Sequence, residues 1–152
     1  MHKTADILFQ ILTTLWVGGL WATGFLIAPI LFSALPDKAL AGMLAGNFFA
    51  AIAWVGIGCG TYLILFRLFR FGGSAFKQWA FWITLFMLLL TLLGHFGIQP
   101  LLAQLKLQAA KDVMETMMKS RFAVWHGVAS ILYICQSLMG AVLILKQGKA
   151  IQ

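Results

Sequence analysis

The feature of this sequence that most restricts its fold is a set of four long apolar runs without an internal charge. They cover about residues 7–32, 46–66, 79–98 and 122–145. A transmembrane helix needs about 20 apolar residues to cross a hydrocarbon core of about 30 Å. In lipid, each backbone amide of such a segment must be paired within the segment itself. We therefore predict an all-α membrane protein, a single four-transmembrane-helix bundle over residues 1–152.

The overall composition agrees with this prediction. Hydrophobic residues make up 62% of the chain and charged residues 10%, whereas soluble domains average about half and about a quarter. The first run is longer than the apolar region of a secretory signal peptide, about 7 to 15 residues, so we expect it to be retained as a span. The net charge of +7 is expected to reflect basic loops near lipid headgroups, and not nucleic-acid binding.

The basic residues also predict an orientation, because loops rich in Lys and Arg stay on the cytoplasmic side. The connection after the second run reads RLFRFGGSAFK and contains no acid. With four spans, this connection and both termini share one face of the membrane. We predict a multi-pass protein of the plasma (inner) membrane with both termini in the cytoplasm.

The connection between the third and fourth runs has a helical pattern of its own. Pro100 stands where a helix tolerates proline, at its first position. Apolar residues then recur every three or four positions up to Met117, while most charged residues fall between them. The pattern predicts an amphipathic helix over about residues 100–119, lying on the outer membrane face or capping the bundle.

Small residues recur one helical turn apart in the first two runs. Such spacing lets helix backbones approach closely in lipid, where association depends on tight packing. We predict that these faces pack the first two spans together, with a substrate passage lined by glycine as the alternative. The residues concerned are Gly18, Gly19 and Ala22 in the first run and Gly42, Gly46, Ala50, Gly56 and Gly60 in the second.

These segments carry a resemblance to a known family. The stretch LWVGGLWATGFLIAPILFSALPDKALAGMLAGNFF, followed later by QPLL and RFAVWHGVAS, resembles domain-of-unknown-function family 4149, which is similar to the eukaryotic transmembrane protein 205 family. The resemblance covers nearly the whole chain and implies a multi-pass membrane protein without an established activity. The positions that match are Trp16, Gly18, Gly19, Pro29, Phe32, Gly42, Gly46, Pro100, His126 and Gly127.

Two histidines lie inside the apolar runs, where a polar residue is costly and marks a functional site by default. His126 lies about one turn into the fourth run, and His95 about one turn before the end of the third. In a four-span fold both are then near the outer face, where Asn47 and Gln99 also begin or end a run. We predict an outward-facing ligand pocket formed by these four residues.

Two chemistries suit such a pocket. Imidazoles on neighbouring helices can ligate haem iron from opposite sides, or they can bind copper together with thioethers. The candidate metal ligands are His95, His126, Met114, Met117 and Met118. The methionines are equally suited to ordinary apolar packing, and His126 to a neutral hydrogen bond with a neighbouring helix, so these alternatives stay open.

Signs of other chemistry are few. Cys59 and Cys135 lie deep in the spans without zinc spacing, no phosphate-binding loop occurs, and the four acids fall in or beside loops. The sequence therefore predicts no enzymatic apparatus and favours a protein that binds a small ligand or metal. The alternatives are a haem or porphyrin enzyme, a structural or assembly partner in the membrane (including a homo-oligomer), and an oligomeric permease.

Overall fold

The structure, a computed structural model, describes the backbone of residues 2–109 and 115–147 and the side chains of residues 4–105 and 121–146. Within this part of the chain every regular element is a helix. In chain order they are α1 (His2–Trp21), the π-helical turn η1 (Ala22–Ile27), α2 (Ala28–Ala34), α3 (Lys38–Phe71), the 3₁₀ helix η2 (Gly72–Lys77), α4 (Trp79–Leu92), the π-helical turn η3 (Leu93–Ile98), α5 (Gln99–Ala109) and α6 (Glu115–Gln147).

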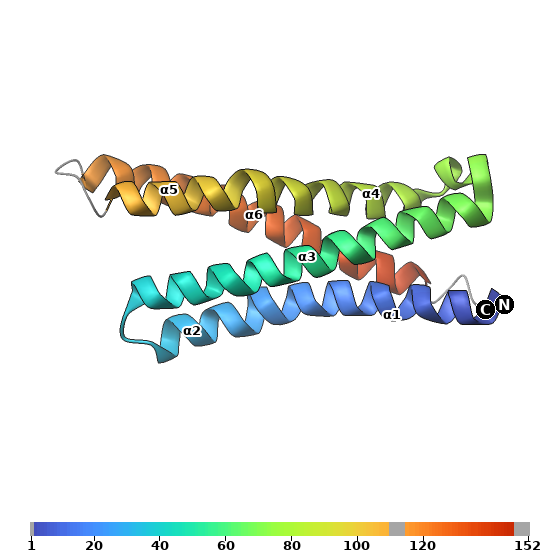
Figure 1. Ribbon diagram of the computed structural model, residues 1–152, viewed down its shortest axis with the longest axis horizontal. Coiled ribbons are helices and arrows are strands. Elements are labelled where there is room, and N and C mark those ends of the chain that lie inside the picture. The colour runs from blue at the N-terminus through green and yellow to red at the C-terminus, as the bar shows by residue number, and fades with distance from the viewer. Residues whose placement is uncertain (1, 110–114, 148–152) are drawn as a thin grey trace.

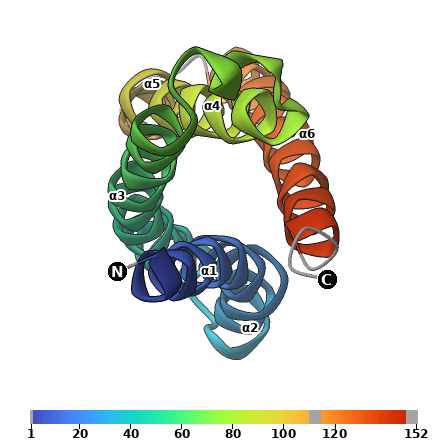
Figure 2. The same cartoon turned by 90° about the vertical axis from the view of Figure 1, so that its right-hand side faces the viewer.

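Consecutive elements join into four long rods that are apolar enough to cross a membrane. They are Thr4–Ala34, Lys38–Lys77, Trp79–Leu105 and Arg121–Lys146. The start of α1, the end of α6 and η2 lie at the same end of the bundle (Figure 1). Viewed along the bundle, α1, α3, α4 and α6 follow one another around a ring (Figure 2). The predicted all-α four-helix bundle is confirmed.

Local sequence explains where α3 begins and ends. The Asp37 carboxylate accepts hydrogen bonds from the N–H groups of Ala39 at 2.8 Å and Leu40 at 3.2 Å, which caps the start of α3. At the other end Gly72 has a φ of 51°, a conformation open to glycine and costly for other residues. The chain turns there into η2 and then enters α4.

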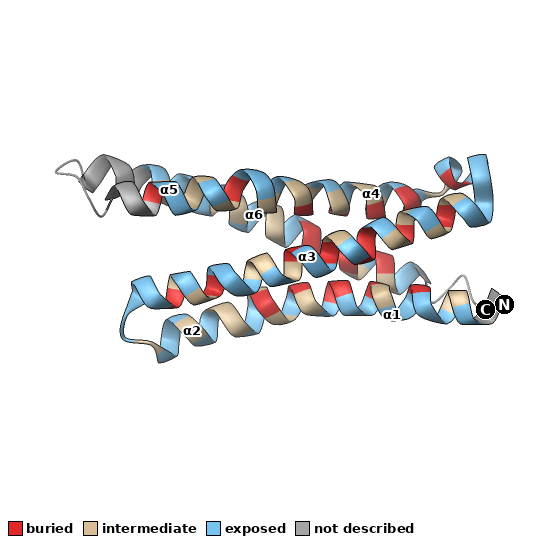
Figure 3. Cartoon of the chain, viewed as in Figure 1, coloured by how far each residue is buried: buried red, intermediate tan, exposed pale blue. Residues whose placement is uncertain are grey.

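The core is narrow and lies where the four rods face one another. Trp16, Leu63, Met87 and Leu143 are completely buried there, one from each rod. Buried residues follow the inner sides of the helices, while much of the outer surface is exposed (Figure 3). Many large apolar side chains point outward, as expected of helices that face lipid.

The segment of the predicted amphipathic helix, about residues 100–119, is divided between two elements. The first part of this segment belongs to α5, which continues the line of α4 (Figure 1). The last residues of the segment belong to the start of α6. Residues 110–114 lie outside the described part of the chain. The third rod therefore extends past residue 98, where its apolar run ends.

The third rod continues through Pro100 because a wider turn precedes this residue. Proline lacks an N–H group and clashes with the carbonyl four residues before it. In η3 the N–H of Gln99 bonds to Gly94, five residues back, so the turn is widened just before the proline. The first rod has the same arrangement, since Ala28 bonds back to Thr23 just before Pro29. Each π turn thus carries its helix past a proline.

The first and third rods correspond to each other at an offset of 71 residues. At this offset the first residue of η1, Ala22, corresponds to the first residue of η3, Leu93. Pro29 likewise corresponds to Pro100. The offset also pairs two fully buried threonines, whose hydroxyls donate to the carbonyls of Phe9 at 2.9 Å and Ala80 at 2.8 Å. The identical pairs are Thr13 and Thr84, Phe25 and Phe96, Ile27 and Ile98, Pro29 and Pro100, and Leu31 and Leu102. The bundle therefore consists of two helical hairpins, and the first helix of each hairpin has a π turn before a proline at the corresponding position.

Candidate functional site

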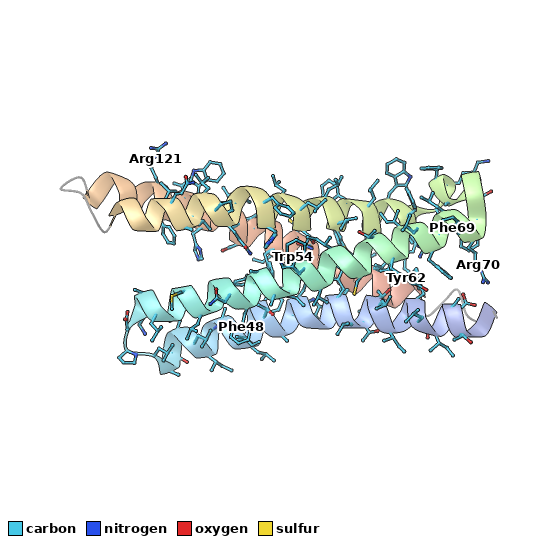
Figure 4. The ribbon with its side chains drawn as sticks, in the orientation of Figure 1. Phe48, Trp54, Tyr62, Phe69, Arg70 and Arg121 are labelled. Atoms are coloured by element: carbon cyan, nitrogen blue, oxygen red, sulfur yellow. The ribbon has the colours of Figure 1, made fainter. Side chains whose placement is uncertain are left out.

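His95 lies in the π turn η3, on the side of the third rod that faces α3. Its side chain is partly buried, and its Nδ1 lies 3.1 Å from Oε1 of Gln99, one turn further on. The imidazole also meets the indole of Trp54 edge-on, with 5.1 Å between ring centroids. Figure 4 shows Trp54 directed from α3 toward the third rod. An amide oxygen can only accept, so Nδ1 is the donor in this pair, and Nε2 has no hydrogen-bond partner among the described residues.

The backbone at His95 offers a second acceptor. A helical carbonyl is normally paired with the N–H four residues ahead, or five in a π turn. For His95 these positions are Gln99, whose N–H bonds to Gly94, and Pro100, which has no N–H. The His95 carbonyl therefore has neither donor from its own helix. The turn η3 therefore carries both the imidazole of His95 and a carbonyl without a donor from its own helix.

The equivalent turn in the first rod is filled by a side chain of α6. Gly24 stands at the position equivalent to His95, and a Cβ there would lie 2.3 Å from the Tyr133 ring. The Tyr133 hydroxyl donates to the carbonyl of Leu20 and also bonds to the Gly24 backbone. The two turns therefore differ in what occupies them: a tyrosine from α6 in one, and the histidine of the turn itself in the other.

The helix geometry gives the depth of His95 in the bundle. His95 lies 16 residues after Trp79, where the third rod begins, or about 24 Å at 1.5 Å per residue. In a hydrocarbon core of about 30 Å, this distance places it in the half away from η2 and the start of α1.

The other predicted pocket residues lie apart from His95. His126 is exposed on α6 and stacks on Phe122, with 5.7 Å between ring centroids. Asn47 is exposed near the start of α3. Among the described side chains, no hydrogen bond or ring contact joins either residue to His95. Of the four predicted residues, the structure brings together His95 and Gln99.

The described residues supply few donors for a metal. They contain no group of three or more His, Cys, Asp and Glu side chains that could hold a metal ion. Both thiols are free, with Cys59 buried and Cys135 exposed. Met114 lies outside the described residues, as do the side chains of Met117 and Met118. Haem or copper binding therefore stays a prediction that rests on the histidines.

The glycines divide into those that meet another helix and those that do not. A Cβ on Gly56 or Gly60 would lie 2.4 Å or 3.0 Å from the Trp16 indole, and one on Gly19 would lie 2.2 Å from Ile52. These three positions hold the first rod against α3. Gly42 is partly buried. A Cβ on Gly18, Gly46 or Gly127 has no described atom within 4 Å outside its own turn.

A buried polar cluster near the bundle centre was not among the predicted site residues. The Gln136 amide donates to the Thr91 hydroxyl at 2.6 Å and to the Met87 carbonyl at 3.3 Å, linking α6 to α4. Gln136 and Thr91 are both more than nine-tenths buried. The signal for this cluster is present in the sequence, because an amide inside a charge-free span is costly unless it is paired.

Comparison with known proteins identifies the family of this chain. A family model described as a domain of unknown function, DUF4149, matches residues 11–111, which leaves His126 and Gly127 beyond the matched range. No curated protein and no solved structure matches the chain, so the resemblance to the transmembrane protein 205 family stays a prediction. The matched residues make up more than half of the 152 residues, and the chain belongs to the DUF4149 family.

Proposed function

We propose that this protein binds a small ligand at His95, in the half of the bundle away from its termini. The observation that carries the proposal is the hydrogen bond between His95 and Gln99 on a turn with an unpaired carbonyl. Gln99 fixes the ring and its tautomer, as second-shell partners do for histidines that bind ligands or metals. A polar residue held in this way inside an apolar span is a functional candidate by default.

The surroundings of His95 favour an amphiphilic ligand. Nε2 and the backbone carbonyl both accept hydrogen bonds, so the ligand should carry a donor group, or present a metal centre to Nε2. The neighbouring Trp54 and Phe96 rings are each more than half exposed, and they offer an apolar surface to the rest of the molecule. Entry from the lipid then requires no aqueous channel.

The equivalent turn in the first rod supports the same proposal. There the chain provides a ring of its own, because Tyr133 packs against Gly24 of the π turn and its hydroxyl donates to the carbonyl of Leu20, just before that turn. No described side chain donates to the carbonyl of His95. In lipid an unpaired carbonyl costs several kcal/mol, so a ligand that donates to it would be stabilised.

The test is to purify the full-length protein in mild detergent and identify what remains bound. A visible spectrum reports haem, elemental analysis reports copper, and mass spectrometry of an organic extract reports other molecules. His95→Ala and Gln99→Leu are compared with His126→Ala, which removes an exposed imidazole of the same type. We expect about one ligand per chain in wild type and in His126→Ala, loss in His95→Ala, and partial loss in Gln99→Leu.

Two results would reject the proposal. One is a wild-type protein without any stoichiometric metal or small molecule. The other is equal ligand content in the His95 and His126 variants while both remain folded. A ligand lost only from His126→Ala would move the site to α6.

We also propose that the protein lies in the plasma (inner) membrane with both termini in the cytoplasm. The basic connection from Arg67 to Lys77 supports this orientation. The start of α1 and the end of α6 lie at the same end of the bundle as this connection (Figure 1).

A further inference from the structure

A second feature of the bundle lies at the opposite end from His95. Arg67, near the end of α3, has only 9% of its surface exposed. Long basic side chains near the ends of transmembrane helices normally extend their charge to the interface. Arg67 instead packs between the first rod and the start of the third.

The contacts that Arg67 makes with described residues are all with uncharged groups. Its Nη1 donates to the amide oxygen of Gln78 at 2.7 Å, and its guanidinium lies over the Phe9 ring at 4.9 Å. Its Nε is buried without a hydrogen-bond partner. No described carboxylate lies within 4 Å of it, since the nearby acid Asp6 pairs with Arg70 at 3.6 Å.

Among the described residues, the charges around Arg67 do not compensate its positive charge. The described residues at this end of the bundle include the basic side chains of Arg67, Arg70, Lys77 and Lys146 against one acid, Asp6. A buried charge without a counter-charge is strongly unfavourable. The free energy of this end of the bundle would therefore fall if an anion bound there.

We propose that Arg67 is the centre of a binding site for a phosphate group. A guanidinium presents its donors in a planar fork that matches phosphate oxygens two at a time, and at Arg67 the Nε donor of that fork is still unpaired. The phosphate can belong to the headgroup of an anionic lipid or to a free phosphate ion. This site is separate from the His95 site, and neither proposal depends on the other.

The experiment measures binding to the full-length protein in phosphatidylcholine nanodiscs. Phosphatidylglycerol is titrated into the discs, and sodium phosphate is added in a separate series at constant ionic strength. The readout is the thermal midpoint of unfolding, with native mass spectrometry to count retained lipids. We expect a saturable rise in the midpoint, and about a tenfold or greater loss of apparent affinity in Arg67→Gln.

The matched control is Arg121→Gln, which makes the same chemical change at the other end of the bundle. Arg121 is exposed and points away from the helices (Figure 4). We expect its affinity to equal that of wild type. If Arg67→Gln does not fold, Arg67→Lys takes its place; it keeps the charge without the planar fork, and we expect a smaller loss of affinity.

The outcomes separate the two sources of phosphate. A response to phosphatidylglycerol alone assigns the site to a lipid headgroup, and a response to both titrants shows that the phosphate group is sufficient. The absence of a saturable response in wild type would overturn the proposal. So would an affinity unchanged in every folded Arg67 variant.

Discussion

Replacing Gly56 with alanine tests the packing of the first rod against α3. The added Cβ would lie 2.4 Å from Nε1 of Trp16 and 3.0 Å from its Cδ1. Trp16 is completely buried, and Gly60, one turn further along α3, lies against the benzene end of the same indole. The ring therefore has no free space to move into, and the helices must separate or the side chain must leave its position. Gly58→Ala is the control, because a Cβ at Gly58 on the same helix has no described atom within 4 Å.

The expected magnitude follows from two opposing terms. Alanine is favoured over glycine in a helix by about 0.8–1.0 kcal/mol, and this term is the same in both variants. Overpacking of a close-packed contact costs about 1–3 kcal/mol, and it applies only at Gly56. We therefore expect the free energy of unfolding of Gly56→Ala to be about 1–3 kcal/mol below that of Gly58→Ala.

The assay is unfolding by sodium dodecyl sulfate in mixed micelles, followed by circular dichroism. Tryptophan fluorescence is unsuitable because the substitution changes the environment of Trp16 directly. A difference between the two variants of less than about 0.5 kcal/mol would contradict the close approach, since surface substitutions fall within that range.

Two further predictions test the first hairpin and the topology. Tyr133→Phe removes the hydroxyl that bonds to the first rod, and we expect the free energy of unfolding to fall by about 0.6 kcal/mol, the mean for hydrogen bonds between membrane helices, and by no more than about 1.7 kcal/mol. Tyr62→Phe is its control, because the Tyr62 hydroxyl makes no hydrogen bond within the described part of the chain; equal losses would remove the role of the bond. Reporter fusions at Ser74 and Gln152 should both report the cytoplasm, and a periplasmic signal at either position would overturn the predicted orientation.

The helices were predictable from the sequence because burial in lipid demands long charge-free runs. Their lengths were not, since hydropathy reports which residues face lipid and not where a helix ends. The third run ends at Ile98 because Gln99 and Pro100 follow, yet the rod continues as α5 through these residues. Polar residues end a lipid-facing surface without ending a helix.

The glycines show a second limit of sequence reasoning. Gly42 and Gly46 have the same spacing as Gly56 and Gly60, so spacing alone predicts close packing at both pairs. Only the second pair meets the Trp16 indole, and a Cβ on Gly46 has no described neighbour. Which face of α3 points inward depends on the partner helix, and a single helix does not contain that information.

The site was predicted only in part, because spacing along one helix does not show which residues of two helices meet. His95 and Gln99 are one turn apart, so their pairing follows from helical spacing alone. The contact with Trp54 depends on how α3 lies against the third rod, and it was not predicted. His126 and Asn47 are polar residues in apolar runs like His95, but both are exposed, and no described contact joins either of them to it.

The correspondence between the two π turns explains why the polar residue of the site falls at His95. In the first rod the equivalent position is Gly24, because a side chain there would collide with the Tyr133 ring. At the turn of the third rod the described rings in contact with His95 are those of Trp54 and Phe96, so this position carries an imidazole that reaches Trp54. In both turns the carbonyl five residues before the proline has no donor in its own helix, because the turn is widened and the proline has no N–H. The two turns therefore differ in what they contain: the first is filled by Tyr133 of α6, and the second carries the histidine at which we propose that the ligand binds.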